Sequence, residues 1–158
     1  MDVDRRCTAL ALLLMLAACG SVPPAPLAWA PARLSLDLAT GVALHAISLV
    51  GTPYRYGGNT PESGFDCSGL IGYVYTAQAG LPVPRTVAAL ANWGQAVAAD
   101  AVRTGDLVVF APHGAATHAG IYVGEGRFVH APSSGGEVRL DRLTSGYWSR
   151  QPTAFRRP

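Results

Sequence analysis

One cysteine in the middle of the chain lies in a pattern that could carry chemistry. Cys67 follows Asp66 and precedes Ser68 and Gly69 within the stretch SGFDCSGL. Aspartate is a preferred N-cap, so Asp66 predicts a helix that begins at Cys67. The positive end of a helix favours a thiolate, the reactive form of cysteine. Three roles stay open for Cys67 on this basis: a buried packing residue, a metal ligand or a nucleophile.

Two of the four histidines are placed where they could act on a thiol. His118 begins one expected strand and His130 ends the next. With a three-residue hairpin loop at residues 124–126, His130 lies opposite Gly120, and the two imidazoles share one face on a diagonal of about 7–8 Å. A two-residue loop would turn them to opposite faces. The two glycines of this loop favour the three-residue hairpin, so one imidazole could take the thiol proton while the other orients it.

The other two histidines, His45 and His113, fall in an expected helix and an expected loop, and we interpret both as structural. A zinc site built from Cys67, His118 and His130 with water is an alternative to the nucleophile. The chain lacks close ligand pairs such as CxxC or HExxH. We therefore expect no metal and no cofactor.

Helices are expected first along the chain and strands afterwards. Apolar residues at helical spacing predict a helix within residues 38–50. A second helix follows Asp66 and ends at Gly80, and a short third helix starts near Thr86. Strands are expected at residues 106–110, 119–123, 127–131 and 137–140. This order predicts an α+β fold with helices packed on an antiparallel sheet, not a βαβ series.

The N-terminal residues are typical of an export signal. A basic start is followed by the apolar run CTALALLLMLAA, which is too short to span a hydrocarbon core of about 30 Å. Its end, LAAC at residues 16–19, resembles the lipobox of bacterial lipoproteins. That resemblance implies cleavage before Cys19, lipidation of Cys19 and a stable acyl anchor. Gly20 in place of aspartate favours the periplasmic face of the outer membrane over the inner one. A plain signal peptide with an incidental cysteine is the alternative.

The resulting domain organisation leaves a single free thiol. We expect a signal peptide at residues 1–18, a proline-rich tether at 19–35 and a catalytic domain at 36–158. Cys7 would leave with the signal and Cys19 would carry lipid, so Cys67 alone would face an oxidising compartment. An unpaired cysteine there favours a chemical role. The net charge of +2 on 158 residues argues against nucleic-acid binding.

With these motifs in place, the sequence resembles an NlpC/P60 cell-wall peptidase domain. The matching segments are GTPYRYGG, FDCSGL, LPVPRTV, TGDLVVF, THAGIYVGEGRFVHAPSSGG and the closing Tyr147-Trp148. The resemblance implies a papain-like fold and hydrolysis of amide bonds in peptidoglycan stem peptides through a thioester. The bond implied is commonly the one between γ-D-glutamate and meso-diaminopimelate.

The resemblance also implies a role for individual residues. Cys67 corresponds to the nucleophile, His118 to the general base and His130 to the residue that orients it. A second set would support the substrate or the oxyanion: Tyr54, Asp66 and Ser68. Asp66 could equally be only a helix cap.

Two other functions remain open on the same fold. One is a related thiol amidase or acyltransferase with a different acyl donor, and the other is a non-catalytic lipoprotein that binds the cell wall. The expected partners are stem peptides, and the membrane through the anchor at Cys19. The protein is expected to be a monomer that binds no nucleic acid.

Overall fold

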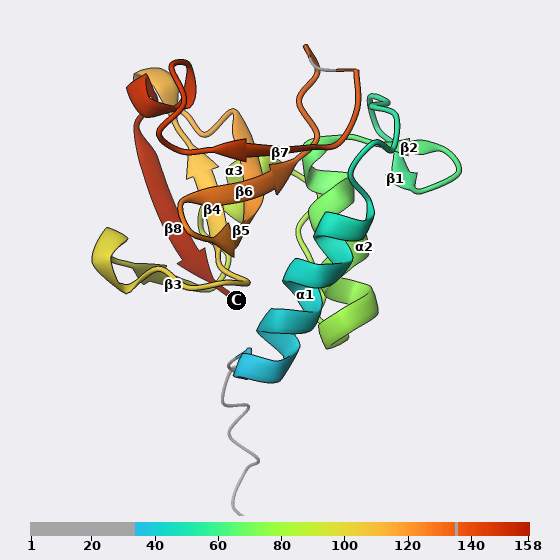
Figure 1. Cartoon of the computed structure of the whole chain (residues 1–158), viewed down its shortest axis with the longest axis horizontal. Helices are drawn as coiled ribbons and strands as arrows, with labels where there is room; N and C mark the ends of the chain where they lie inside the picture. The colour runs from blue at the N-terminus through green and yellow to red at the C-terminus, as the bar shows by residue number, and fades with distance from the viewer. Residues whose placement is uncertain (1–33, 135) are drawn as a thin grey trace, which may run out of the picture. The chain divides into compact units, whose positions relative to one another are not determined.

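The computed structural model describes residues 34–134 and 136–158, which form helices and an antiparallel sheet (Figure 1). The helices are α1 (Leu36–Ser48), α2 (Cys67–Ala79) and α3 (Val87–Leu90), with 3-10 turns η1 (Ala99–Ala101), η2 (Pro112–Gly114) and η3 (Trp148–Arg150). The strands are β1 (Asn59–Thr60), β2 (Gly64–Phe65), β3 (Gln95–Val97), β4 (Leu107–Phe110), β5 (His118–Gly124), β6 (Arg127–His130), β7 (Arg139–Arg142) and β8 (Thr153–Arg157). The expected α+β class is confirmed.

The predicted signal peptide, the lipidation site Cys19 and all but the last two residues of the predicted tether lie outside the described residues. Those last two residues belong to the packed part of the chain. Leu34 is only 3% exposed, and its N–H donates to the Pro158 carbonyl. The Ser35 side chain accepts from the Leu38 N–H and caps α1. Within the described part of the chain, no helix is long and apolar enough to cross a membrane.

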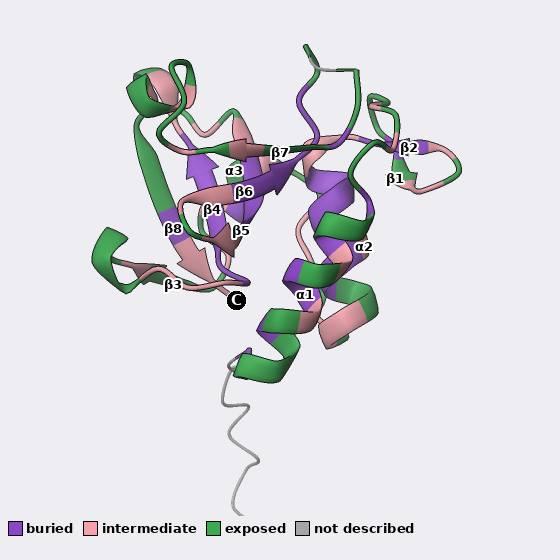
Figure 2. Ribbon diagram, in the orientation of Figure 1, coloured by how far each residue is buried: buried purple, intermediate pink, exposed green. Residues whose placement is uncertain are grey.

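The main sheet has six antiparallel strands in the order β3-β8-β4-β5-β6-β7. Helices α1 and α2 lie together on one side of it, and their buried faces turn toward the strands (Figure 2). Side chains such as Val74, Ile121 and Val129 fill that layer. A second, smaller core lies on the opposite face of the sheet, where Phe110, Phe128 and Phe155 pack with Trp148. The histidine side chains contact this second core.

Helix α2 begins where its sequence predicts. The Asp66 side chain accepts a hydrogen bond from the Gly69 N–H, which satisfies an otherwise unpaired donor of the first turn. The helix ends at Gly80, which adopts the left-handed conformation (φ 62°) that glycine enters without steric cost. Both predicted ends of this helix are therefore confirmed. They fix Cys67 at the first helical position.

The hairpin that carries the histidines differs from its prediction in one respect. Its loop has two residues, Glu125 and Gly126, both with positive φ, as a type I′ turn requires. The predicted three-residue loop is therefore wrong. An irregularity between Tyr122 and Gly124 then shifts the register, so that Ile121 faces Val129. This bulge restores the predicted shared face of the histidines, because it adds one residue to β5.

Strand β7 also lies later than predicted. It spans Arg139–Arg142 instead of residues 137–140, because the two preceding residues pair elsewhere. Glu137 forms a bridge with Pro53, and the Val138 N–H donates to the Thr52 carbonyl. This pairing ties the segment before Tyr54 to the segment before β7.

Candidate active site

The start of α2 is built around the Asp66 carboxylate. Asp66 Oδ1 accepts from the Gly69 N–H at 2.6 Å and from Ser68 Oγ at 2.9 Å, and Oδ2 accepts from the Gly57 N–H at 2.9 Å. The carboxylate thus holds both the first turn and the preceding loop around Cys67. The capping role of Asp66 is confirmed, whereas its contact with substrate stays a prediction.

The same loop lies directly on the first turn of the helix. A Cβ at Gly69 would overlap the Gly58 carbonyl, and the Asp66 N–H donates to that carbonyl at 3.1 Å. Only glycine at position 69 allows this approach. The Arg85 guanidinium reaches Asp66 Oδ2 at 3.8 Å from the other side. These contacts hold the first turn of α2, which carries Cys67, against the preceding loop.

Cys67 is the only free cysteine within residues 34–134 and 136–158, and it is half-buried. Burial raises the pKa of Cys67, and the negative charge of Asp66 raises it further. Hydrogen bonds with the backbone of Ser68 and Ala119 lower the pKa, but by less. Burial and the Asp66 charge therefore oppose the helix terminus, which by itself favours a thiolate. Cys67 is a neutral thiol at neutral pH.

The two predicted histidines form a hydrogen-bonded pair. His118 Nε2 and His130 Nδ1 are 2.8 Å apart. Since Cys67 is hydrogen-bonded to the backbone of Ala119, the thiol lies beside the residue that follows His118. A Cβ at Gly120 would lie 2.8 Å from the Phe128 ring and 3.1 Å from the His130 Cβ. Gly120 therefore leaves the space in which the His130 ring lies beside His118.

Both imidazoles are neutral in this environment. Burial, with a smaller contribution from His130, lowers the pKa of His118 to about 3. Burial also lowers the pKa of His130 to about 4, although Asp141 opposes the shift. A neutral imidazole keeps a lone pair that can accept a proton. The two nitrogens face each other instead of converging on a common point, and no metal-binding cluster of three or more His, Cys, Asp or Glu side chains occurs among the described residues.

Two residues that the sequence did not predict complete the cluster. Asp141 Oδ2 lies 3.0 Å from His130 Nε2 and accepts from Trp148 Nε1, also at 3.0 Å. The Trp148 indole stacks on His118, with ring centroids 5.4 Å apart and planes at 23°. Asp141 faces Phe128 across β6 and β7, which repeats the diagonal offset between His118 and His130. A correct boundary for β7 would have revealed it.

A cavity of about 450 Å³ opens beside this cluster. His118, His130, Asp141 and Trp148 line it, together with polar side chains from the loop after β6, from the start of β7 and from the two residues that flank η3: Ser133, Ser134, Arg139, Tyr147 and Gln151. A neutral base at the wall of a polar cavity suits a reaction on a polar substrate.

The predicted support residues gather around Cys67 to different extents. Tyr54 is half-buried, and burial raises the pKa of its phenol. The charges of Cys67 and Asp66 raise this pKa further, so both groups lie in the neighbourhood of the phenol. Ser68 is only 6% exposed and its hydroxyl is bonded to Asp66. Tyr54 is thus better placed than Ser68 to meet a substrate.

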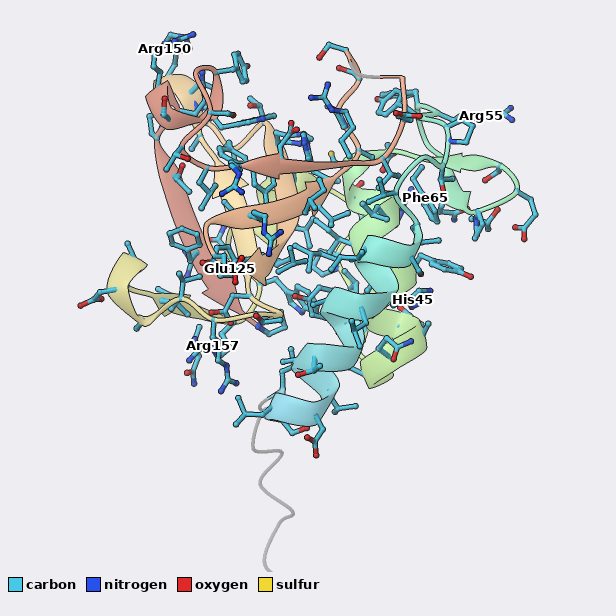
Figure 3. All side chains as sticks on the ribbon, viewed as in Figure 1. His45, Arg55, Phe65, Glu125, Arg150 and Arg157 are labelled. Carbon is cyan, nitrogen blue, oxygen red and sulfur yellow. The ribbon has the colours of Figure 1, made fainter. Side chains whose placement is uncertain are left out.

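The remaining histidines lie elsewhere. His45 Nδ1 is 3.1 Å from Gln78 Nε2, a contact that joins α1 to α2, and Figure 3 shows His45 on the helical layer away from the sheet. His113 is exposed in η2 with a φ of 58°. Their positions agree with the structural interpretation.

The comparison with known families agrees with this geometry. Residues 51–157 match the NlpC/P60 family. The chain belongs to the NlpC/P60 family. Among solved structures, the NlpC/P60 domain of the peptidoglycan hydrolase SagA superposes with a TM-score of 0.65 at 29% identity, covering 73% of this chain and 96% of that one. The papain-like NlpC/P60 fold is therefore confirmed.

Curated relatives of this NlpC/P60 chain are longer proteins. The murein DD-endopeptidase MepH of Escherichia coli is 38% identical over 130 residues, which cover 79% of this chain and 48% of MepH. The γ-DL-glutamyl hydrolase of Bacillus subtilis is 38% identical over 130 residues, which cover 79% of this chain and 31% of that protein. The chain thus spans about half or less of the length of these relatives, whose names describe different bonds.

Proposed function

We propose that this protein is a cysteine peptidase that hydrolyses amide bonds in peptidoglycan stem peptides. The observation that carries the proposal is the hydrogen-bonded pair of His118 and His130, together with Cys67 at the first position of α2, whose thiol meets the backbone of Ala119, the residue after His118. The family supports it, because relatives of the chain are named as murein endopeptidases. Cys67 is the nucleophile, His118 the base and His130 the residue that orients His118.

The neutral state of the thiol and the imidazoles supports the following order of proton transfers. His118 takes the proton from the Cys67 thiol as sulfur attacks the carbonyl carbon of the amide. The backbone N–H of Cys67, at the helix start, donates to the developing oxyanion. His118 returns the proton to the leaving nitrogen as the C–N bond breaks, and a thioester remains. His118 then takes a proton from water as the oxygen attacks the thioester carbonyl; the C–S bond breaks, and the proton passes from His118 to the released Cys67 sulfur.

The bond between γ-D-glutamate and meso-diaminopimelate is the proposed point of cleavage. Relatives are named for both DD and DL bonds, so the test identifies the products. Purified sacculi are digested with wild type and Cys67→Ala, and the released peptides are analysed by mass spectrometry. We expect a new terminal γ-D-glutamate only with wild type. Equal digestion by Cys67→Ala would overturn the mechanism.

A related acyltransferase on the same fold would share the thioester but pass the acyl group to an amine. The same digestion, run with an added amine such as glycine amide, distinguishes the two. Free carboxyl products indicate hydrolysis, whereas amide products indicate transfer. A wall-binding protein without catalysis would retain sacculi in a pull-down and release no peptide.

We also propose that the protein is a lipoprotein anchored through Cys19 at the periplasmic face, in the outer membrane by preference over the inner. The lipobox-like residues 16–19 support this assignment. Cys19→Ala should move the protein from the membrane fraction to the soluble periplasm. An unchanged distribution after fractionation would contradict the anchor.

A further inference from the structure

The His118–His130 pair does not end at His130. His130 is fully buried, and its Nε2 lies 3.0 Å from Asp141 Oδ2. Neighbouring strands β5, β6 and β7 each contribute one member to a diagonal row across the same face of the sheet: His118, His130 and Asp141. Two hydrogen bonds therefore connect the carboxylate to His118.

Asp141 is held in its ionised form by three donors. Burial alone raises the pKa of Asp141, but hydrogen bonds from Trp148, His130 and Arg139 outweigh it and bring the pKa below its ordinary value. Trp148 Nε1 and Arg139 Nη2 can only donate hydrogen bonds, so the Asp141 carboxylate is the acceptor in both contacts. An ionised carboxylate cannot donate, so His130 Nε2 must carry the proton that it shares with Asp141.

This requirement determines the tautomer of both rings. A neutral imidazole with a proton on Nε2 has its lone pair on Nδ1, so His130 Nδ1 accepts from His118. His118 Nε2 must then carry the donated proton, since these two nitrogens share one hydrogen bond of 2.8 Å. The lone pair of His118 is left on Nδ1. A base is thus available on the nitrogen that does not face His130.

We propose that Asp141 is a positioning residue that sets the tautomers of His130 and His118 and so makes His118 Nδ1 the base for Cys67. The catalytic part of this inference rests on the proposed peptidase function. When the thiol proton moves, the S–H bond breaks and an N–H bond forms at His118 Nδ1. The resulting imidazolium keeps its Nε2 proton directed at His130, and the Asp141 charge favours it.

A purely structural role for Asp141 is the competing explanation. Its bond to Trp148 holds an indole that packs against Phe110, Phe128 and both histidines. Loss of this bond could loosen that packing without a change of tautomer. Two substitutions separate the explanations. Asp141→Asn keeps an acceptor for Trp148 and adds a donor toward His130, whereas Trp148→Phe removes the indole donor and keeps the carboxylate.

The test uses protein labelled with ¹⁵N-histidine, in which NMR distinguishes protonated from unprotonated ring nitrogens. Wild type should show Nε2–H on both His118 and His130. In Asp141→Asn the amide donates to His130 Nε2, so both protons should move to Nδ1. Trp148→Phe should keep the wild-type tautomers. Wild-type tautomers in folded Asp141→Asn, or Nδ1–H on His118 in wild type, would each overturn the proposal.

Kinetics on a stem peptide complete the test. We expect kcat of Asp141→Asn to fall by about 100-fold or more, the range of general acid–base catalysis, with KM within about threefold of wild type because asparagine keeps the size and polarity of the side chain at the cavity wall. Unchanged kcat in a variant with switched tautomers would contradict the catalytic part. Wild type with the expected tautomers and no hydrolysis would instead refute the proposed peptidase function. The wild-type spectrum decides the tautomer claim even if Asp141→Asn does not fold.

Discussion

Two carboxylate networks at the sheet differ in their chemistry. At one, Asp106 is fully buried and pairs with Arg157 through two bonds of 2.8 Å, to Nε and Nη2. The Arg103 N–H and the Ala101 carbonyl complete the hydrogen bonds of that pair. Figure 3 shows Arg157 near the end of β8, beside β3. Every group in this network has a charged or backbone partner, so nothing in it is available to react.

At the other network, charge is compensated only at one end. Asp141 binds Trp148, Arg139 and His130, but the chain of hydrogen bonds continues through two neutral rings to the cavity wall at His118. The Asp106 network stabilises the fold. The Asp141 network instead leaves a lone pair on His118 Nδ1, at the end of the hydrogen-bond chain that is not paired with a charge. Both networks use a carboxylate as acceptor. A guanidinium partner gives the Asp106 network a structural role, whereas a neutral imidazole partner lets the Asp141 network act on His118.

The largest effect on stability is expected at the Asp106 network, in which Asp106 is paired with Arg157. Arg157→Gln leaves the fully buried Asp106 carboxylate without its cation. We expect the free energy of unfolding to fall by about 3 kcal/mol, as for a buried pair that loses one partner. Urea denaturation measures this loss. Hydrolysis per folded molecule should stay at the wild-type level, and a parallel loss of turnover would erase the contrast between the networks.

The Asp141 network should make stability depend on pH. An unfolded histidine has a pKa near 6.5, while the folded pKa values of His118 and His130 are about 3 and 4. Between pH 6.5 and 4 the unfolded chain binds protons that the folded chain does not. The free energy of unfolding should therefore decrease as pH falls through this window.

Thermal unfolding between pH 7 and 4 measures that slope. His118→Gln removes one of the two groups and should make the slope shallower. Arg157→Gln keeps both histidines and should show the wild-type slope from a lower starting point. A Tm that does not change between pH 6.5 and 4 would show that the histidines are not buried as neutral rings.

The smallest effect concerns the thiol of Cys67. In protein with Cys7→Ser and Cys19→Ser, the rate of alkylation of Cys67 by iodoacetamide should be low at pH 7 and rise steadily with pH, because its pKa is raised. Asp66→Asn keeps a good helix cap but removes the charge, so its curve should shift to lower pH. A rate that is already maximal below pH 7 would indicate a thiolate–imidazolium pair instead.

The sequence predicted one end of the Asp141 network and missed the other. Cys67 followed from the cap at Asp66, and the shared face of His118 and His130 followed from strand periodicity. The loop length was wrong, since a bulge compensated for a tighter turn. Bulges arise from local twist and leave little trace in residue type.

The missed residues depend on contacts that are distant in sequence. Asp141 was not predicted because residues 137 and 138 pair with the segment before Tyr54, which moves β7 by two positions. Strand β8 and its Arg157 pair were missed because β8 lies between β3 and β4 in the sheet, although Phe155 is its only buried residue and gives no alternating apolar pattern. Such pairings are decided by tertiary packing and not by local propensity.

The most direct test of the account is the turnover number of His118→Gln on a stem peptide, measured in protein whose unfolding midpoint at pH 7 matches wild type. Glutamine keeps a hydrogen bond toward His130 but has no nitrogen lone pair that could take the Cys67 proton. The account predicts a fall in kcat of about 100-fold or more, the contribution of a positioned base. A variant that retains kcat within about threefold of wild type would contradict the assignment of His118 as the base.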